Sequence, residues 1–247
     1  MKAILLGAGY ATRLYPLTKN KAKPLLEVAG KTITDHIVEK IIQVPEVDEI
    51  IIVTNDKFAH QFEEWVEQAD YDMKFTVVND GTLTNETRLG AIGDIQFVID
   101  QLGIQDDLLI LAGDNLFEFS LAEFVDFAKD YDSDTLAMYY EANLDQLKRN
   151  GTANFDENRT VTDFIEKPDK PTYNHCVPTF YVLKESTIPL IQEYLNAGNN
   201  PDAPGNFIPY LIQHNQVKAF VFEGKRYDIG TVESYEQVQK LFANDEV

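Results

Sequence analysis

The amino-acid sequence predicts an α/β fold: a Rossmann-like, mixed but mainly parallel sheet with helices on both faces, plus a small β-rich insertion. Two observations carry this prediction. Up to about residue 140, short apolar runs alternate with amphipathic segments, which is typical of strands alternating with helices in a parallel sheet. The run Glu49–Thr54 is apolar at consecutive positions, as expected for a strand that is covered on both faces.

The first 140 residues divide into strands and helices by the period of their apolar positions. We expect strands at residues 3–6, 49–54, 74–79, 107–112 and 135–140. We expect the helices between them at residues 34–44, 58–69, 85–102 and 120–129.

After about residue 150 the strands come closer together, and this segment is the predicted β-rich insertion. Residues 151–155 and 160–165 form two close strands joined by a hairpin-like turn. Further strands are expected at residues 179–183 and 217–222, and helices at 185–196, 207–214 and 232–242. No linker long enough to separate two domains is present, so residues 1–247 are predicted to form a single domain.

The composition bounds the class of protein. The 247 residues are 44% hydrophobic, enough for a sizeable core, and carry a formal net charge of −20. This charge argues against nucleic acid and anionic membranes as partners. Cys176 is the only cysteine, which suits a reducing compartment. With no apolar run of membrane-span or signal-peptide length, we expect a cytoplasmic protein.

Positive charge is concentrated at the start of the chain. Residues 1–31 hold six basic side chains and one acidic side chain, although the whole chain is strongly acidic. The apolar run Ala3–Leu6 leads into a loop in which Gly7 and Gly9 can point backbone N–H groups into one concavity. Arg13 and Lys23 add fixed charge to this loop. The segment therefore predicts a site for a small polyanion.

Three other interpretations compete for this loop. One is a surface loop with solvated lysines. A dinucleotide-binding fold would place its third glycine at position 12 and start a helix at once, but residue 12 is threonine and Pro16 interrupts such a helix. The phosphate loop of nucleotide hydrolases would end in Gly-Lys-Ser/Thr, which is absent.

The segment from Leu6 to Lys31 resembles the N-terminal signature of the sugar-1-phosphate nucleotidylyltransferases, L-A-A-G-x-G-T-R-L-x-P-L-T followed by P-K-P-L-L-x-V-x-G-K-P. Three further blocks resemble the same family in the same order: residues 111–115, residues 151–168 with their G-V-V-x-F-D … V-x-x-F-x-E-K-P pattern, and residues 227–235 with their D-I-G-T pattern. The resemblance implies transfer of a nucleotidyl group from a nucleoside triphosphate to a sugar 1-phosphate or similar phosphomonoester.

The resemblance also implies roles for individual residues. Residues 1–140 would mainly bind the nucleotide, and residues 141–247 the acceptor. Arg13, Lys23 and Asp114 would be catalytic, and Asp114 with Asp228 would hold Mg²⁺ or Mn²⁺. The nucleotide-binding residues implied are Leu6, Gly7, Ala8, Gly9, Thr12, Arg13, Lys23, Asn79, Gly81, Thr82 and Asp114. The acceptor-binding residues implied are Asn115, Gly151, Glu166, Lys167, Thr179 and Tyr181.

Local departures from the family pattern leave alternatives open. Ala11 replaces a glycine and narrows the approach of the backbone to phosphate, Ala22 replaces a proline, and Thr179 replaces a glycine at the sugar pocket. A cytidylyltransferase acting on a phosphomonoester such as phosphocholine, and a non-catalytic nucleotide-sensing homologue, are the two alternative functions. Neither the nucleobase nor the sugar is fixed by the sequence, and a homo-oligomer is compatible with it.

Overall fold

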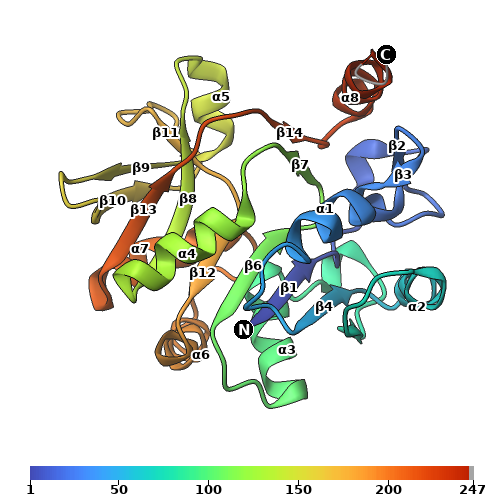
Figure 1. Cartoon of the computed structure of the whole chain (residues 1–247), viewed down its shortest axis with the longest axis horizontal. Coiled ribbons are helices and arrows are strands. Elements are labelled where there is room, and N and C mark those ends of the chain that lie inside the picture. The colour runs from blue at the N-terminus through green and yellow to red at the C-terminus, as the bar shows by residue number, and fades with distance from the viewer. Residues whose placement is uncertain (245–247) are drawn as a thin grey trace.

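The computed structural model describes residues 1–244 and confirms the predicted fold class (Figure 1). One ten-stranded mixed sheet runs through the molecule in the order β10-β9-β11-β8-β12-β6-β1-β4-β5, with β13 paired to β8. Helices cover both of its faces. No helix in the described part of the chain combines the length and apolarity needed to cross a bilayer.

The strands of the main sheet are β1 (Lys2–Leu6), β4 (Glu49–Thr54), β5 (Phe75–Asn79), β6 (Leu108–Ala112), β8 (Asp134–Tyr140), β9 (Gly151–Phe155), β10 (Val161–Ile165), β11 (His175–Val177), β12 (Phe180–Leu183) and β13 (Val217–Val221). Two small ribbons pair β2 (Glu27–Val28) with β3 (Lys31–Thr32), and β7 (Asn115–Phe117) with β14 (Arg226–Asp228). The helices are α1 (Ile33–Ile41), α2 (Ala59–Gln68), α3 (Ala91–Leu102), α4 (Leu121–Tyr131), α5 (Leu144–Arg149), α6 (Ile188–Asn196), α7 (Ile208–His214) and α8 (Val232–Asn244).

The parallel part of the sheet comes from the first half of the chain. Strand β1 pairs in parallel with both β4 and β6, so that Leu6 stands beside Val53 on one side and Ala112 on the other. Strand β5 continues the parallel order beyond β4. The carboxyl ends of these strands therefore lie at one edge, and the loops that follow β1 and β6 emerge side by side there.

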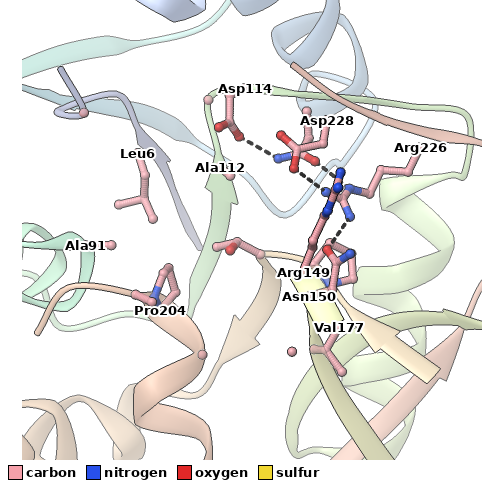
Figure 2. A pocket seen from close by; sticks show the side chains of 18 of the residues that line it. Leu6, Ala91, Ala112, Asp114, Arg149, Asn150, Val177, Pro204, Arg226 and Asp228 are labelled. Atoms are coloured by element: carbon pink, nitrogen blue, oxygen red, sulfur yellow. Dashed lines mark hydrogen bonds and ion pairs between the residues drawn. The ribbon is translucent and has the colours of Figure 1, made fainter. Parts of the chain in front are cut away.

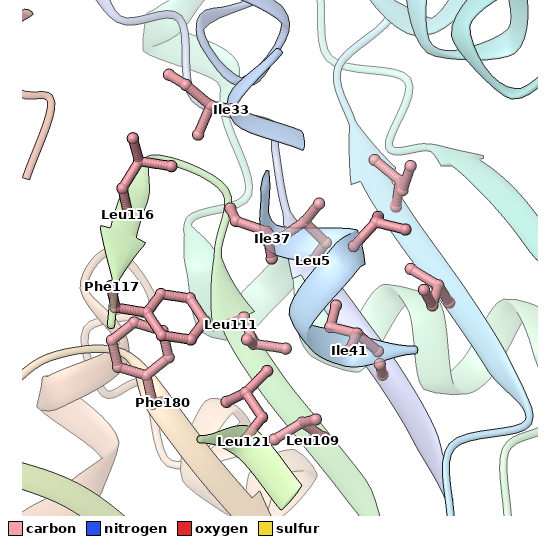
Figure 3. Close-up of a cluster of buried hydrophobic side chains, with 14 of the residues drawn as sticks. Leu5, Ile33, Ile37, Ile41, Leu109, Leu111, Leu116, Phe117, Leu121 and Phe180 are labelled. Carbon is pink, nitrogen blue, oxygen red and sulfur yellow. The ribbon is translucent and has the colours of Figure 1, made fainter. Parts of the chain in front are cut away.

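Alternate side chains of the central strands face two separate hydrophobic clusters. On β1, Ala3 and Leu5 belong to one cluster, while Ile4 belongs to the other. The first cluster packs under α1 and α4 and includes Leu109, Leu111 and Phe180 (Figure 3). The second packs under α3, α6 and α7. Strands that are apolar on both faces are thus explained by helices on both sides.

The predicted β-rich segment extends the antiparallel side of the sheet. Strands β9 and β10 form the expected hairpin, and β9 pairs with β11, which pairs in turn with β8. Strand β12 runs antiparallel between β6 and β8 and joins this side to the parallel part. Segments from both halves of the chain therefore meet around one sheet edge.

The predicted helix at residues 85–102 is shorter in the structure. Residues 85–90 form a 3₁₀ turn and a loop, and α3 begins at Ala91. Gly90 has φ +83°, and a Cβ there would lie 2.6 Å from the carbonyl oxygen of Pro201. The loop at residues 200–205 docks on this helix start: Ala91 N donates to Asp202 O and Ile92 N to Pro201 O. The docking of this distant loop therefore sets the start of α3 after Gly90. The local pattern of apolar residues does not reveal this contact.

We predict that Asp94 makes the protein less stable as pH rises. Asp94 is only 7% exposed, and burial, helped by the neighbouring Asp80 carboxylate, raises the pKa of Asp94 to about 8. The folded state therefore keeps a proton that the unfolded state releases near pH 4. The free energy of unfolding should fall by up to about 1.4 kcal/mol per pH unit between pH 5 and pH 8 from this group.

Urea unfolding of the wild type and of Asp94→Asn at several pH values measures this slope. The variant cannot ionise at this position, so its stability should decline less over the same interval and exceed that of the wild type at pH 8. Asp130→Asn, at an exposed position on α4, is the matched control and should follow the wild type. Parallel curves for Asp94→Asn and the wild type would contradict the prediction.

Candidate nucleotide and acceptor site

A pocket of about 390 Å³ lies at the carboxyl ends of the parallel strands. It is lined by the loop after β1, by the residues that follow β6, and by segments from the second half of the chain (Figure 2). The predicted site residues among its lining are Leu6, Gly7, Gly9, Arg13, Lys23, Asp114, Asn115, Gly151, Glu166, Lys167, Thr179, Tyr181 and Asp228. The structure therefore brings four separated sequence blocks to one place.

The two glycines of the first loop have different surroundings. The N–H of Gly7 donates to Val53 O at 2.8 Å, so the expectation that both glycines offer free N–H groups is wrong for Gly7. This bond prolongs the β1–β4 pairing by one residue. Gly9 is exposed, and a Cβ added there would meet no atom within 4 Å. The open part of the loop thus begins at Gly9.

The two alanines that depart from the family pattern are accommodated differently. Ala11 has φ 47°, a left-handed conformation that favours glycine, and Thr18 Oγ1 donates to its carbonyl at 2.7 Å. Ala22 is fully buried, and its N–H donates to Gln61 Oε1 at 2.9 Å. A proline has no N–H, so Ala22 makes a hydrogen bond that the usual residue cannot make.

The charged centre of the pocket is an ion pair between Lys23 and Asp114. Lys23 Nζ lies 2.6 Å from Asp114 Oδ2, although the two residues are 91 positions apart. Burial favours the neutral acid, but Lys23, Arg226 and a hydrogen bond from Asn115 outweigh it and hold the pKa of Asp114 below its ordinary value. Asp114 is therefore an anion held among cations at the end of β6.

Asp228 is brought beside Asp114 by the β7–β14 ribbon, which the sequence did not predict. Residue 228 is the register partner of Asn115, and Ile229 N donates to Asp114 O at 3.1 Å. The Asp228 side chain is 54% exposed and pairs with Arg226 at 3.2 Å. The backbones of Asp114 and Asp228, two residues far apart in the sequence, thus lie on neighbouring segments.

Three polar lining residues were missed by the sequence analysis: Arg149, Asn150 and Arg226. The Arg226 side chain is only 8% exposed, and its Nε donates to Asn115 Oδ1 at 2.6 Å. Arg226 also lies beside Asn150 and Asp228 (Figure 2). Arg149 is exposed at the end of α5. Arg226 stands only two residues before Asp228, which is the signal that could have identified it.

Glu166 and Lys167 reach the pocket because the strand ends before them. Strand β10 stops at Ile165, and Lys167 has φ 45°, so the alternation of a regular strand no longer holds and both residues line the pocket. Their charged groups are 3.5 Å apart. Burial raises the pKa of Glu166 against the effect of this lysine.

The carboxylate of Glu166 fits between two glycines. A Cβ on Gly151 would lie 2.8 Å from Glu166 Oε2, and a Cβ on Gly205 would overlap the same oxygen. Gly205 follows Ala203 and Pro204 in the loop that docks on α3, and all three residues line the pocket. The position of Glu166 therefore depends on small residues from two separate segments.

Five predicted nucleotide-binding residues are not among the pocket lining: Ala8, Thr12, Asn79, Gly81 and Thr82. The Asn79 amide donates to Asp56, and its oxygen accepts from Gly81 N, so these groups stabilise a turn after β5. Thr82 contacts the first loop through Tyr10, with their hydroxyl oxygens 3.2 Å apart. Ala91, at the start of α3, lines the pocket instead.

The loop after β1 and a lysine–aspartate pair lie together at the carboxyl edge of a Rossmann-like sheet, the edge at which open α/β sheets bind their ligands. The sequence pattern of the nucleotidyl transferase family matches residues 2–245. The chain therefore belongs to the nucleotidyl transferase family, and the resemblance seen in its motifs is confirmed.

Curated relatives are similar over most of this chain. A UTP–glucose-1-phosphate uridylyltransferase of Haloferax volcanii is 25% identical, with 97% of this chain and 96% of that protein covered. A glucose-1-phosphate adenylyltransferase of Clostridium novyi is 26% identical over 95% of this chain and 64% of that protein. The bifunctional protein GlmU of Methanocaldococcus jannaschii is 26% identical over 93% of this chain, which spans about half (51%) of that protein.

Solved structures show the same fold. A crystal structure of UDP-glucose pyrophosphorylase with UDP-glucose has a TM-score of 0.84 to this chain at 20% identity, covering 99% of this chain and 98% of that one. The apo form of UDP-glucose pyrophosphorylase also has a TM-score of 0.84.

We predict that Gly113 and Gly9 have separable roles. A Cβ on Gly113 would lie 2.7 Å from the backbone oxygen of Leu6, so Gly113→Ala should lower the free energy of unfolding by about 1–3 kcal/mol. Gly9→Ala faces open space and should change it by less than about 0.5 kcal/mol. Urea unfolding of both variants tests this, and equal losses would contradict it.

Proposed function

We propose that this protein transfers a nucleotidyl group from a nucleoside triphosphate to a sugar 1-phosphate, releasing pyrophosphate and forming a nucleoside-diphosphate sugar. An oxygen of the sugar phosphate attacks the α-phosphorus, and the bond from that phosphorus to the β-phosphate oxygen breaks in line. Two of the relatives are named as enzymes of glucose 1-phosphate, which supports a sugar phosphate as acceptor.

One observation carries the proposal: a single pocket joins cations of the first loop with a carboxylate–lysine pair of the second half. Arg13 and Lys23 come from the segment after β1, and Glu166 and Lys167 follow β10. Two anionic substrates must be brought together against their mutual repulsion, and cations from both segments offset it. An in-line transfer asks little covalent chemistry of the protein, so positioning and charge neutralisation suffice.

The roles proposed follow from position. Arg13, exposed at the mouth of the pocket, binds the β- and γ-phosphates of the triphosphate. Lys23 binds the α-phosphate and the attacking phosphate. Lys167 binds the phosphate of the acceptor, and the buried carboxylate of Glu166 orients its hydroxyl groups. The apolar residues Val177, Pro178 and Tyr181 form the wall behind the acceptor.

Asp114 and Asp228 fit a divalent cation by the chemistry of their donor set. Both offer hard carboxylate oxygens from neighbouring backbone segments, and Mg²⁺ is commonly held by one or two carboxylates together with substrate phosphates and water. Asp114 is already held as an anion by neighbouring cations. A bound Mg²⁺, or Mn²⁺ in its place, would neutralise phosphate charge in the transition state.

Pyrophosphate release across a panel of nucleoside triphosphates and phosphomonoesters, phosphocholine included, tests the proposal. We expect release with at least one triphosphate and sugar 1-phosphate pair, in the presence of Mg²⁺. Arg13→Ala should lower kcat/KM, and the loss should correspond to about 2–4 kcal/mol of transition-state stabilisation. Lys19→Ala, in the same loop but outside the pocket lining, is the control. Release only with phosphocholine, or with no pair, would overturn the proposal.

The acceptor side gives a second prediction. Glu166→Gln keeps the shape and removes the charge, and Gly205→Ala displaces the same carboxylate. Both should raise the KM of the acceptor several-fold more than that of the triphosphate. Glu157→Gln, exposed in the hairpin turn, should leave both constants unchanged. Steady-state kinetics with each substrate varied in turn is the measurement, and equal changes in both constants would move Glu166 out of the acceptor site.

A further inference from the structure

Arg226 contacts one residue in each of three distant segments, and Asp228 on its own strand β14. Its Nε donates to Asn115 Oδ1, and its Nη1 donates to Asn150 Oδ1 at 3.1 Å. Its Nη2 lies 3.2 Å from Asp228 Oδ2, and Tyr139 OH accepts a longer bond of 3.5 Å. The side chain is only 8% exposed. These contacts hold the plane of the guanidinium group on every side.

The bond from Arg226 also fixes the orientation of the Asn115 amide. Because the amide oxygen accepts from Arg226, the amide nitrogen points the other way and donates to Asp114 Oδ1 at 2.6 Å. A reversed amide would set an N–H against the guanidinium group, which has no acceptor. Arg226 is thus linked to Asp114 through one amide and to Asp228 directly.

All three nitrogens of Arg226 already bind groups of the protein itself. This distinguishes Arg226 from a cation whose nitrogens are left for a substrate. Arg149 offers the contrast: it lines the same pocket and is exposed, and within residues 1–244 no hydrogen bond or ion pair involves its side chain. Removing Arg226 would free the Asp228 carboxylate to rotate and leave the amide of Asn115 without its fixed orientation.

We propose that Arg226 is a positioning residue that holds Asp114, through Asn115, and Asp228 directly, in the arrangement in which both carboxylates face one cation. The inference rests on the proposed function for the role of these carboxylates. Residues that orient metal-binding groups typically change metal affinity or activity 10- to 100-fold when they are replaced. The effect of Arg226 should therefore fall on the cation and on kcat, and much less on the KM of the acceptor.

The test compares Arg226→Lys, which keeps the charge but loses the planar fork, with Arg226→Met and the control Arg149→Met. Binding of Mn²⁺ alone, followed by the electron paramagnetic resonance signal of the free ion, should weaken about ten-fold in both Arg226 variants. Their kcat should fall about 10- to 100-fold with the acceptor KM within two-fold. Arg149→Met should leave the Mn²⁺ affinity unchanged.

A purely structural role predicts a different pattern: lower thermal stability of the Arg226 variants with unchanged Mn²⁺ affinity and kcat, which would overturn the proposal. Wild-type protein that binds no Mn²⁺ would also overturn it. If the Arg226 variants do not fold, Asn115→Ala removes the connecting amide with Arg226 in place, and unchanged Mn²⁺ affinity there would be decisive against it. Absence of pyrophosphate release with every substrate pair would refute the proposed reaction but leave the Mn²⁺ comparison valid.

Discussion

The ion pair between Lys23 and Asp114 is the interaction on which the site depends. It ties the loop after β1 to the end of β6, two neighbouring strands of the parallel sheet. Each charge is the reason that the other can be tolerated in a partly buried position, because an uncompensated buried charge costs about 3–5 kcal/mol. Asn115 donates to Asp114, Arg226 donates to Asn115, and Arg226 forms an ion pair with Asp228. The Lys23–Asp114 pair therefore anchors the whole polar network.

The fold class was predictable because it depends on residues that are close in sequence. Strands β1, β4 and β6 are continuous apolar runs, and their residues do divide between two cores. The elements that sequence reasoning missed are short, and they are stabilised by pairing with segments that are distant in the sequence. Strands β7 and β14 have three residues each and exist because they pair with one another. The side chains of Asn115 and Arg226, which join the two strands, are 111 positions apart in the sequence.

The candidate site was predictable only where its residues lie in ordered motifs. The blocks around Arg13, Asp114, Glu166 and Asp228 were identified from their patterns, and all of these residues line the pocket. Gly81 and Thr82, expected to bind the nucleotide, lie outside the pocket lining, whereas Ala91 at the start of α3 belongs to it. The docking of a distant loop at the start of α3 leaves no local trace in the sequence. Whether the lining residues perform the proposed roles stays a prediction.

The docking of the loop at residues 200–205 on the start of α3 means that the two walls of the pocket are not independent modules. The carbonyls of Pro201 and Asp202 occupy the first N–H groups of α3, and the same loop supplies Gly205 beside Glu166. A side chain at residue 90 would displace this loop. Because the loop carries Gly205, the displacement would change the space around Glu166. The two walls are therefore mechanically linked: a substitution at one wall shifts the other, and an exchange of either segment between relatives must carry its counterpart along.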